Sequence, residues 1–236
     1  MINVIVERLP ATLLLMLTSI AWSAILGIVL GIRASIKRGG AIDNISTMLA
    51  TLSVSIPTFW LGIVLIITLG GMLRILPTQG MLSPANIGMK NLSPAIILDI
   101  SWHLVLPSIT LGMAYLGIYI RSVKSLLIDE LGKDYILLAR AKGLDRSHIL
   151  WRYAFRTASP SIIAILGLNI GTMLAGATLT ETVFAWPGMG RLIYESAIAR
   201  DYPVIHGIFI FISITVILAN LVDDMINALL DPRVRY

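Results

Sequence analysis

The chain has 236 residues, of which 57% are hydrophobic and only 13% are charged, and it has no cysteine. Soluble domains are roughly 45–50% apolar and about 25% charged, so this composition is typical of an integral membrane protein. Without cysteine, the chain has no disulfide framework, no thiolate metal site and no cysteine nucleophile. The formal net charge of +5 does not predict nucleic-acid binding. The basic residues are explained by the excess of Lys and Arg that membrane proteins carry in their cytoplasmic loops.

Five apolar segments are long enough to cross a bilayer, which takes about 20 residues at about 1.5 Å each. In chain order they cover residues 11–32, 45–73, 104–127, 161–180 and 204–222. They are apolar on all sides, unlike the one-sided helices of a soluble bundle. Because backbone in lipid must satisfy its own hydrogen bonds, we predict an all-α membrane protein of about five transmembrane helices, with residues 1–236 forming a single domain.

Glycine and proline mark special positions within these segments. Gly27 and Gly31 have the spacing that lets two helices approach closely, although chance in a glycine-rich apolar sequence is the alternative. Pro57 and Pro107 are expected to kink or cap their helices. Arg121 and Lys124 are the only charges inside the five segments, and they lie near one end, where they can reach the interface.

Two connections between the predicted spans contain further short structural elements. Residues 74–103 are expected to form a loop, in which the short apolar piece 95–100 cannot span and forms at most a surface helix. Residues 181–203 are expected to contain a short helix at 193–200 that lies along the outer membrane interface.

The basic residues predict the orientation. The loops 33–44 and 121–160, together with the C-terminus, contain thirteen of the eighteen Lys and Arg residues. Cytoplasmic loops carry an excess of these residues, so we expect this side and the C-terminus to be cytoplasmic. The N-terminus is then outside, and no secretory signal peptide is evident at residues 1–10, so the chain is expected to lack a preceding span.

The polar interruption at residues 129–160 is the main candidate for docking. Its pattern predicts a short amphipathic helix, a break at Gly143, and a second amphipathic helix up to Pro160. Small residues flanked by basic ones could enter a groove on a partner, and the alternative is a solvated basic loop. The candidate docking residues are Ala139, Arg140, Ala141, Lys142, Gly143 and Leu144.

Several stretches resemble a known family. ARAKGLDRSHILWRYAFRTASPSI is similar to the cytoplasmic EAA loop of binding-protein-dependent ABC transporter permeases, in the form found in dipeptide, oligopeptide, nickel and glutathione importers, and the whole chain resembles their B-type subunits. TETVFAWPGMGRLIYESAIARDYPVI resembles an outer segment of the same family, and NLVDDMINALLDPRVRY resembles its C-terminus. The outer-segment residues singled out by this resemblance are Glu181, Phe184, Trp186, Pro187, Gly188 and Gly190.

The chain departs from the family pattern at two places. The acidic residue of the EAA pattern is absent, and Tyr153 and Thr157 stand where this branch tends to have His and Asn. Members of the branch usually have six spans, so the resemblance too implies that the first span is missing here.

The resemblance implies a type I ABC importer permease in a bacterial or archaeal cytoplasmic membrane. It would pair with a second permease subunit, bind two cytoplasmic P-loop ATPases through the EAA loop, and receive a solute from an external solute-binding protein. The solute would be a peptide, or nickel or a related small solute. ATP and Mg would belong to the ATPases, and this chain would hold no cofactor.

The residues themselves weigh against other functions. An ATP-binding loop needs GxxxxGK followed by Ser or Thr, whereas Gly132-Lys133 is followed by Asp134. No protease motif is present, and the three histidines show no metal-ligand spacing, so we expect neither catalysis nor a metal site. A secondary transporter is the alternative, although it would normally bury charges near the middle of its spans, where this chain has none.

Overall fold

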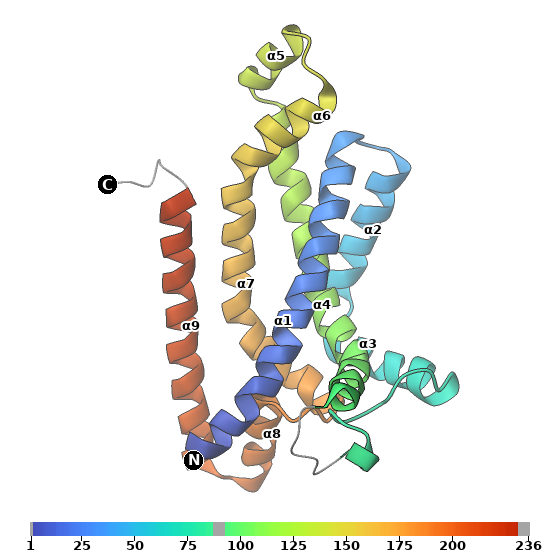
Figure 1. Cartoon of the computed structure of the whole chain (residues 1–236), viewed down its shortest axis with the longest axis vertical. Coiled ribbons are helices and arrows are strands. Elements are labelled where there is room, and N and C mark those ends of the chain that lie inside the picture. Colours follow the sequence, from blue (N-terminus) through green and yellow to red (C-terminus); the bar gives the residue numbers. More distant parts are fainter. Residues whose placement is uncertain (1, 87–92, 231–236) are drawn as a thin grey trace. The chain divides into compact units, whose positions relative to one another are not determined.

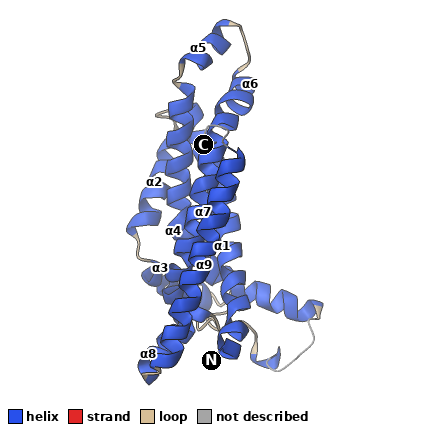
Figure 2. Cartoon of the chain, turned by 90° about the vertical axis from the view of Figure 1, so that its left-hand side faces the viewer, coloured by secondary structure: helices blue, strands red, loops and turns tan. Residues whose placement is uncertain are grey.

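The computed structural model describes the backbone of residues 2–86 and 93–230, and their side chains except at 170–172, 174–176, 223–224 and 226–230. Every regular element in these ranges is a helix, which confirms the all-α prediction (Figures 1 and 2). The α-helices are α1 (Ile2–Ile36), α2 (Ala41–Ser55), α3 (Thr58–Leu65), α4 (Pro94–Leu131), α5 (Asp134–Ala141), α6 (Arg146–His148), α7 (Arg156–Val183), α8 (Met189–Ala199) and α9 (Tyr202–Leu230). Three further helical pieces are the π-helices η1 (Ile66–Met72) and η3 (Ile149–Phe155) and the 3₁₀ turn η2 (Pro84–Asn86).

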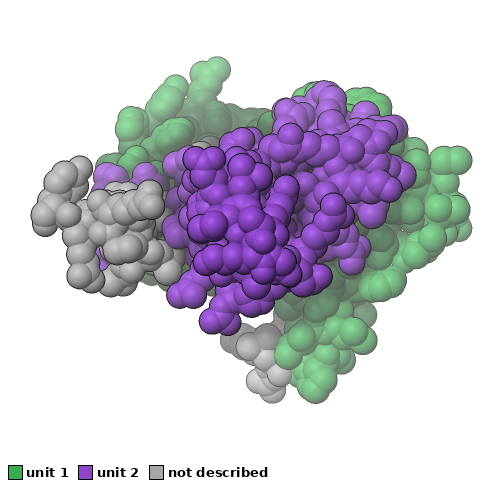
Figure 3. All heavy atoms as spheres, turned by 90° about the horizontal axis from the view of Figure 1, so that it is seen from above, with its two compact units in different colours: residues 1–22, 56–114, 170–216 green, residues 23–55, 115–169, 217–236 purple. Residues whose placement is uncertain are grey.

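The chain divides into two compact units, which Figure 3 shows in different colours. Unit 1 comprises Met1–Trp22, Ile56–Ala114 and Ile170–Val216, and unit 2 comprises Ser23–Ser55, Tyr115–Asn169 and Ile217–Tyr236. The divisions fall within the long helices α1, α4, α7 and α9, so each of these helices contributes to both units. The expectation of a single domain stays a prediction.

Three helices in the described part of the chain are long and apolar enough to cross a membrane. They are α1, α4 and the Tyr202–Val222 part of α9, in agreement with the predicted spans 11–32, 104–127 and 204–222. The predicted span 161–180 lies in α7, which is helical over 28 residues. Because some of its side chains lie outside the described residues, the assignment of α7 as a span stays a prediction.

The predicted span 45–73 is broken at Pro57, where a kink or cap was expected. Helix α2 ends at Ser55, and Pro57 has extended backbone with φ −60° and ψ 132° before α3 begins. Proline has no N–H and disfavours helical backbone in the preceding residue, here Ile56. The two pieces, Ala41–Ser55 and Thr58–Met72, are together long and apolar enough for one span, but they meet at an angle of 101°. This bend confirms the predicted kink.

Helix α4 begins ten residues before the predicted span. It starts at Pro94 and runs without interruption to Leu131, so residues 95–100 are its first turns and not a separate surface helix. Proline is well suited to the first position of a helix, where its missing N–H has no partner to lose. Pro107 lies inside α4 and does not end it.

Two glycines let α1 approach α4 closely within unit 2. A Cβ at Gly27 would lie 2.5 Å from the Cβ of Tyr119, and one at Gly31 would lie 2.8 Å from the Cβ of Val123. Real Cβ atoms do not approach this closely, so only glycine fits. The structure thus confirms the close packing predicted from the Gly27-Gly31 spacing.

We expect Gly27→Ala to lower the midpoint of thermal unfolding in detergent, because the added methyl group would push α1 from α4 at a cost of about 1–3 kcal/mol. Gly71→Ala is the control, since a Cβ there would meet its nearest atom at an ordinary 3.7 Å. Equal midpoints for the two variants would contradict the inferred contact.

The two charges near the end of the predicted span 104–127 have partners in α2. Lys124 forms an ion pair with Asp43 and donates to the Thr47 hydroxyl at 3.0 Å. The Arg121 guanidinium donates to the Ala50 carbonyl at 3.0 Å. These contacts fix α2 against α4 within unit 2.

Candidate functional site

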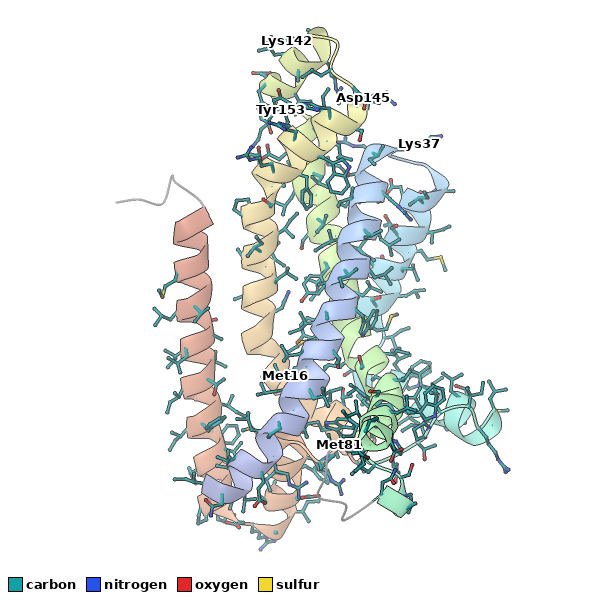
Figure 4. All side chains as sticks on the ribbon, viewed as in Figure 1. Met16, Lys37, Met81, Lys142, Asp145 and Tyr153 are labelled. Atoms are coloured by element: carbon teal, nitrogen blue, oxygen red, sulfur yellow. The ribbon has the colours of Figure 1, made fainter. Side chains whose placement is uncertain are left out.

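The first candidate region is the loop between α4 and α7 in unit 2. Figure 1 shows α5 lying beyond the end of α4, and Figure 4 labels Lys142 at the tip of the loop. The start of α5 is tied to α4, because the Glu130 carboxylate accepts from the Tyr135 hydroxyl at 2.5 Å and pairs with Lys133. Burial raises the pKa of Tyr135, and the bond to Glu130 raises it further, so the hydroxyl stays a neutral donor.

Helix α5 is amphipathic, as predicted, but its faces differ from those inferred from the sequence. Ile136 and Ala139 are buried in the apolar core of unit 2. Leu137 and Leu138 are instead 55% and 57% exposed. Ala139 is only 3% exposed, so the expectation that it is presented to a partner is wrong, and the sequence interpretation missed the two exposed leucines. The membership of Ala139 in the docking loop stays a prediction. The two adjacent leucines form a small apolar patch on the exposed face of α5, where a partner can contact it.

Gly143 ends α5 in a Schellman motif. Its φ is +76°, a region that L-residues with a side chain rarely adopt. The Gly143 N–H donates to the Arg140 carbonyl at 2.9 Å, and the Leu144 N–H reaches back to the Ala139 carbonyl at 3.3 Å. These are the two hydrogen bonds that define the motif. Half-buried Leu144 then packs on the core of unit 2, so the glycine fixes where the chain leaves the helix.

Beyond this turn the chain re-enters helix at Asp145, whose carboxylate accepts from the Ser147 N–H at 2.8 Å as an N-cap. The predicted end of this second helix at Pro160 is wrong, because α7 continues through it. Proline cannot donate to the Arg156 carbonyl, but the Ser159 hydroxyl does so at 2.9 Å. A serine side chain can in this way satisfy the carbonyl that a helical proline leaves free.

The remaining predicted docking residues lie on the solvent side of the loop. Arg140, Ala141, Lys142 and Gly143 are all exposed. The structure thus brings together a basic rim, two exposed leucines and a glycine-determined turn. Such an arrangement suits a protein partner.

The second candidate region, in unit 1, is built around Glu181, which is fully buried near the end of α7. Its carboxylate accepts from the Thr12 hydroxyl at 2.7 Å and from the Arg191 N–H at 3.0 Å. The Thr12 hydroxyl in turn accepts from the Met189 N–H at 2.8 Å. A buried carboxylate is costly unless such donors compensate it, and the N-terminus of a helix provides them. Glu181 therefore caps α8 from another helix.

Two glycines make room for this arrangement. Gly188 precedes α8, and a Cβ there would lie 2.3 Å from the carboxyl carbon of Glu181. A Cβ at Gly190 would lie 2.4 Å from the Cα of Thr178 in α7. Both positions accept only glycine without a shift of their neighbours.

Aromatic residues complete the outer segment. Trp186 is fully buried, and its indole N–H donates to the Ala11 carbonyl at 2.8 Å. Phe184 is also buried, and its carbonyl accepts from the Gly80 N–H at 2.8 Å. Pro187 is half-buried between Trp186 and Gly188. All six predicted outer-segment residues therefore gather in one packed region.

Sequence reasoning missed Thr12 as a member of this region. The signal was present, because Thr12 is a hydroxyl residue within the apolar stretch that begins at residue 11. The short helix predicted at 193–200 is present as α8, which begins four residues earlier. In the described part of the chain, no three His, Cys, Asp or Glu side chains come together as metal ligands would.

Residues 23–236 match the family model described as "Binding-protein-dependent transport system inner membrane component". The chain belongs to this family. The family that the resemblance of the loop and the outer segment implied is thereby confirmed.

Similar proteins are transport permeases. The chain is 35% identical to the dipeptide transport system permease protein DppB of Escherichia coli K12 over 245 residues, which cover 98% of this chain and 72% of that protein. It is 35% identical to the oligopeptide transport system permease protein AppB of Bacillus subtilis, over 99% of this chain and 72% of that protein. It is 36% identical to the glutathione transport system permease protein GsiC of E. coli K12, over 98% of this chain and 70% of that protein.

Solved structures share the fold. An inward-facing structure of the MetNI methionine ABC transporter contains a chain that matches with a TM-score of 0.75 and 18% identity, over 98% of each chain. A chain of an amino acid ABC transporter solved with histidines matches with a TM-score of 0.62 and 14% identity, over 98% of this chain and 94% of that one. The type I ABC importer permease fold implied by the sequence is thus confirmed.

Proposed function

We propose that this chain is the permease subunit of an ATP-driven importer that moves peptides into the cytoplasm. The observation that carries the proposal is α5, which is held firmly at both ends and exposes Leu137 and Leu138. A rigid helix with an exposed apolar face can bind a partner and be displaced as a unit when that partner changes conformation. Relatives at 35–36% identity whose names specify dipeptides, oligopeptides and glutathione support a peptide as the solute, with nickel or another small solute as the alternative.

The partners follow from the same family. Two cytoplasmic P-loop ATPases, which would carry ATP and Mg, bind at α5 and at its counterpart on a second permease subunit, and an external solute-binding protein delivers the peptide. The thirteen basic residues on one side support a cytoplasmic location for the α5 loop and the C-terminus. ATP itself is hydrolysed on the partners, since this chain has no phosphate-binding loop.

The loop can transmit force because its contacts lead into the membrane helices. Tyr135 connects α5 to α4 through Glu130, and Ile136 belongs to the same buried apolar cluster as Leu127 and Ala154. A displacement of α5 by an ATPase therefore moves the ends of α4 and η3 within unit 2. Closely packed interiors pass on such shifts because they deform little.

The test is co-purification combined with uptake. Wild-type chain extracted in mild detergent from its native membrane is expected to bring P-loop ATPases with it, and cells that carry it are expected to take up radiolabelled dipeptide. The paired variant Leu137→Ser/Leu138→Ser should lose both properties, because serine removes the exposed apolar face of α5.

The matched control is Ile97→Ser/Leu98→Ser, a neighbouring pair in α4 that is as exposed as the α5 pair but lies in unit 1. It should retain the ATPases. Recovery of the wild-type chain without any ATPase, even after cross-linking, would instead favour a secondary transporter.

A further inference from the structure

A pocket of about 680 Å³ in unit 2 lies beside the α5 loop and is not explained by ATPase docking. It is lined by the end of α1, the turn after α5 and the start of η3. Three arginines, Arg33, Arg140 and Arg146, line it, whereas none of the acidic residues that the structure describes does. Asp145 is close in sequence, but it is not among the residues that line the pocket, and its carboxylate caps the Ser147 N–H.

The three arginines are exposed and available. None of them forms an ion pair or a side-chain hydrogen bond with any residue that the structure describes. They come from separate elements, since Arg33 is in α1, Arg140 in α5 and Arg146 in α6. Arginine offers a planar set of donors that matches phosphate, so three such groups around one pocket favour a phosphate ligand.

The rest of the pocket wall is apolar. Val29 and Ile32 of α1 contribute to it, together with Leu150 and Trp151 of η3. Val29 and Ile32 belong to the predicted span 11–32, and Arg33 follows directly. Along a helix, Val29 and Arg33 are about 6 Å apart. With the predicted span ending at Ile32, the pocket extends from the edge of the hydrocarbon region to the level of the headgroups.

We propose that this pocket binds an anionic phospholipid from the adjoining leaflet. The phosphate lies among the three guanidinium groups, and one acyl chain follows Val29, Ile32 and Trp151. Basic pockets at the ends of membrane helices bind acidic lipid headgroups in this manner. A soluble phosphate compound satisfies the arginines but leaves the apolar wall uncovered. The bound lipid connects α1 to the α5 loop, and this inference holds whether or not an ATPase binds the loop.

The full-length chain in dodecyl maltoside is tested by native mass spectrometry with added palmitoyl-oleoyl phosphatidylglycerol. The expected result is a retained one-lipid adduct, with palmitoyl-oleoyl phosphatidylcholine bound at least about tenfold more weakly. The test variant removes the three pocket charges: Arg33→Gln, Arg140→Gln and Arg146→Gln. The control removes three exposed charges from the same loop outside the pocket: Lys142→Gln, Arg152→Gln and Arg156→Gln.

We expect the pocket variant to bind phosphatidylglycerol about tenfold more weakly or worse, whereas the control stays within about threefold of wild type. Equal losses in the two variants would show only general attraction to basic charge and would overturn the proposal. Displacement of the lipid by millimolar inorganic phosphate or glycerol phosphate would also overturn it, because the ligand would then be a soluble anion.

A second variant tests the apolar wall with all charges retained. Val29 is 38% exposed, so Val29→Trp should fold normally while filling the acyl part of the pocket.

A quenching assay locates the acyl chain. Phosphatidylglycerol brominated on an acyl chain should quench the fluorescence of Trp151, measured as the difference between the wild type and Trp151→Phe. Loss of this quenching in a folded Arg33→Gln variant would support the proposal, whereas phosphatidylglycerol retention at the wild-type level in Val29→Trp would overturn it.

Discussion

Gly143→Val is expected to reduce peptide uptake by about tenfold or more, while the chain remains in the membrane at its normal level. Gly143 has φ +76°, and a Cβ there would meet no atom of the described residues within 4 Å. The substitution therefore causes no clash, and its effect comes from the backbone alone. A side chain in left-handed conformation costs about 1–2 kcal/mol, and a β-branched one suffers more. The Schellman turn then opens, and Leu144 and the end of α5 change direction.

Two glycine controls distinguish a loss of coupling to the ATPases from a general effect of backbone strain. Gly132→Val lies in the same loop, but Gly132 does not have positive φ, and its Cβ would meet only ordinary contacts. Gly39→Val has the same strain as Gly143→Val, since Gly39 has φ +72° and nothing within 4 Å, but it lies in the turn between α1 and α2. Both controls should take up peptide, and ATPase retention is measured in parallel. Normal uptake by Gly143→Val would refute the proposed role of this turn.

The elements could be predicted from the sequence where their signals are local. Long apolar runs gave the helices α1, α4 and α9, and the positive φ of a helix-ending glycine follows from a single residue, Gly143. The phase of α5 could not be predicted, because residues 136–139 are all apolar and a periodic pattern needs polar residues to mark the other face. Only the core of unit 2 determines that Ile136 and Ala139 are the buried ones.

The prolines show why helix ends were harder to predict. Pro57 breaks its helix, whereas Pro107 and Pro160 lie within theirs. At Pro160 the difference has a visible cause in the Ser159 hydroxyl, which replaces the missing donor. A proline therefore predicts the loss of a hydrogen bond, and its surroundings decide whether the helix ends.

The burial of Glu181 could not be read from the sequence, because its partner is remote. The sequence places this glutamate at the start of an outer connection, where a solvated carboxylate is the ordinary expectation. Its hydrogen-bond partner Thr12 is 169 residues away in the chain. No local pattern connects them, and only the family resemblance marked Glu181 as important.

Gly188→Ala is expected to destabilise the protein by about 2–3 kcal/mol in the wild-type background and by much less in a Glu181→Ala background. The alanine Cβ would lie 2.3 Å from the Glu181 carboxyl carbon, so the buried carboxylate has to leave its donors. Glu181→Ala alone should cost about 2–4 kcal/mol, because the Arg191 N–H loses its acceptor and a cavity forms. That cavity is the space that the new methyl group needs.

The measurement is a double-mutant cycle on thermal unfolding midpoints in detergent, with Gly190→Ala as the control. The three atoms nearest to a Cβ at Gly190 all belong to Thr178, so Glu181→Ala should relieve its effect much less than that of Gly188→Ala. Relief of Gly188→Ala together with much smaller relief of Gly190→Ala would identify the carboxylate as the group for which Gly188 makes room. Equal costs of Gly188→Ala in both backgrounds would mean that Glu181 does not occupy this position, and that α8 is capped without it.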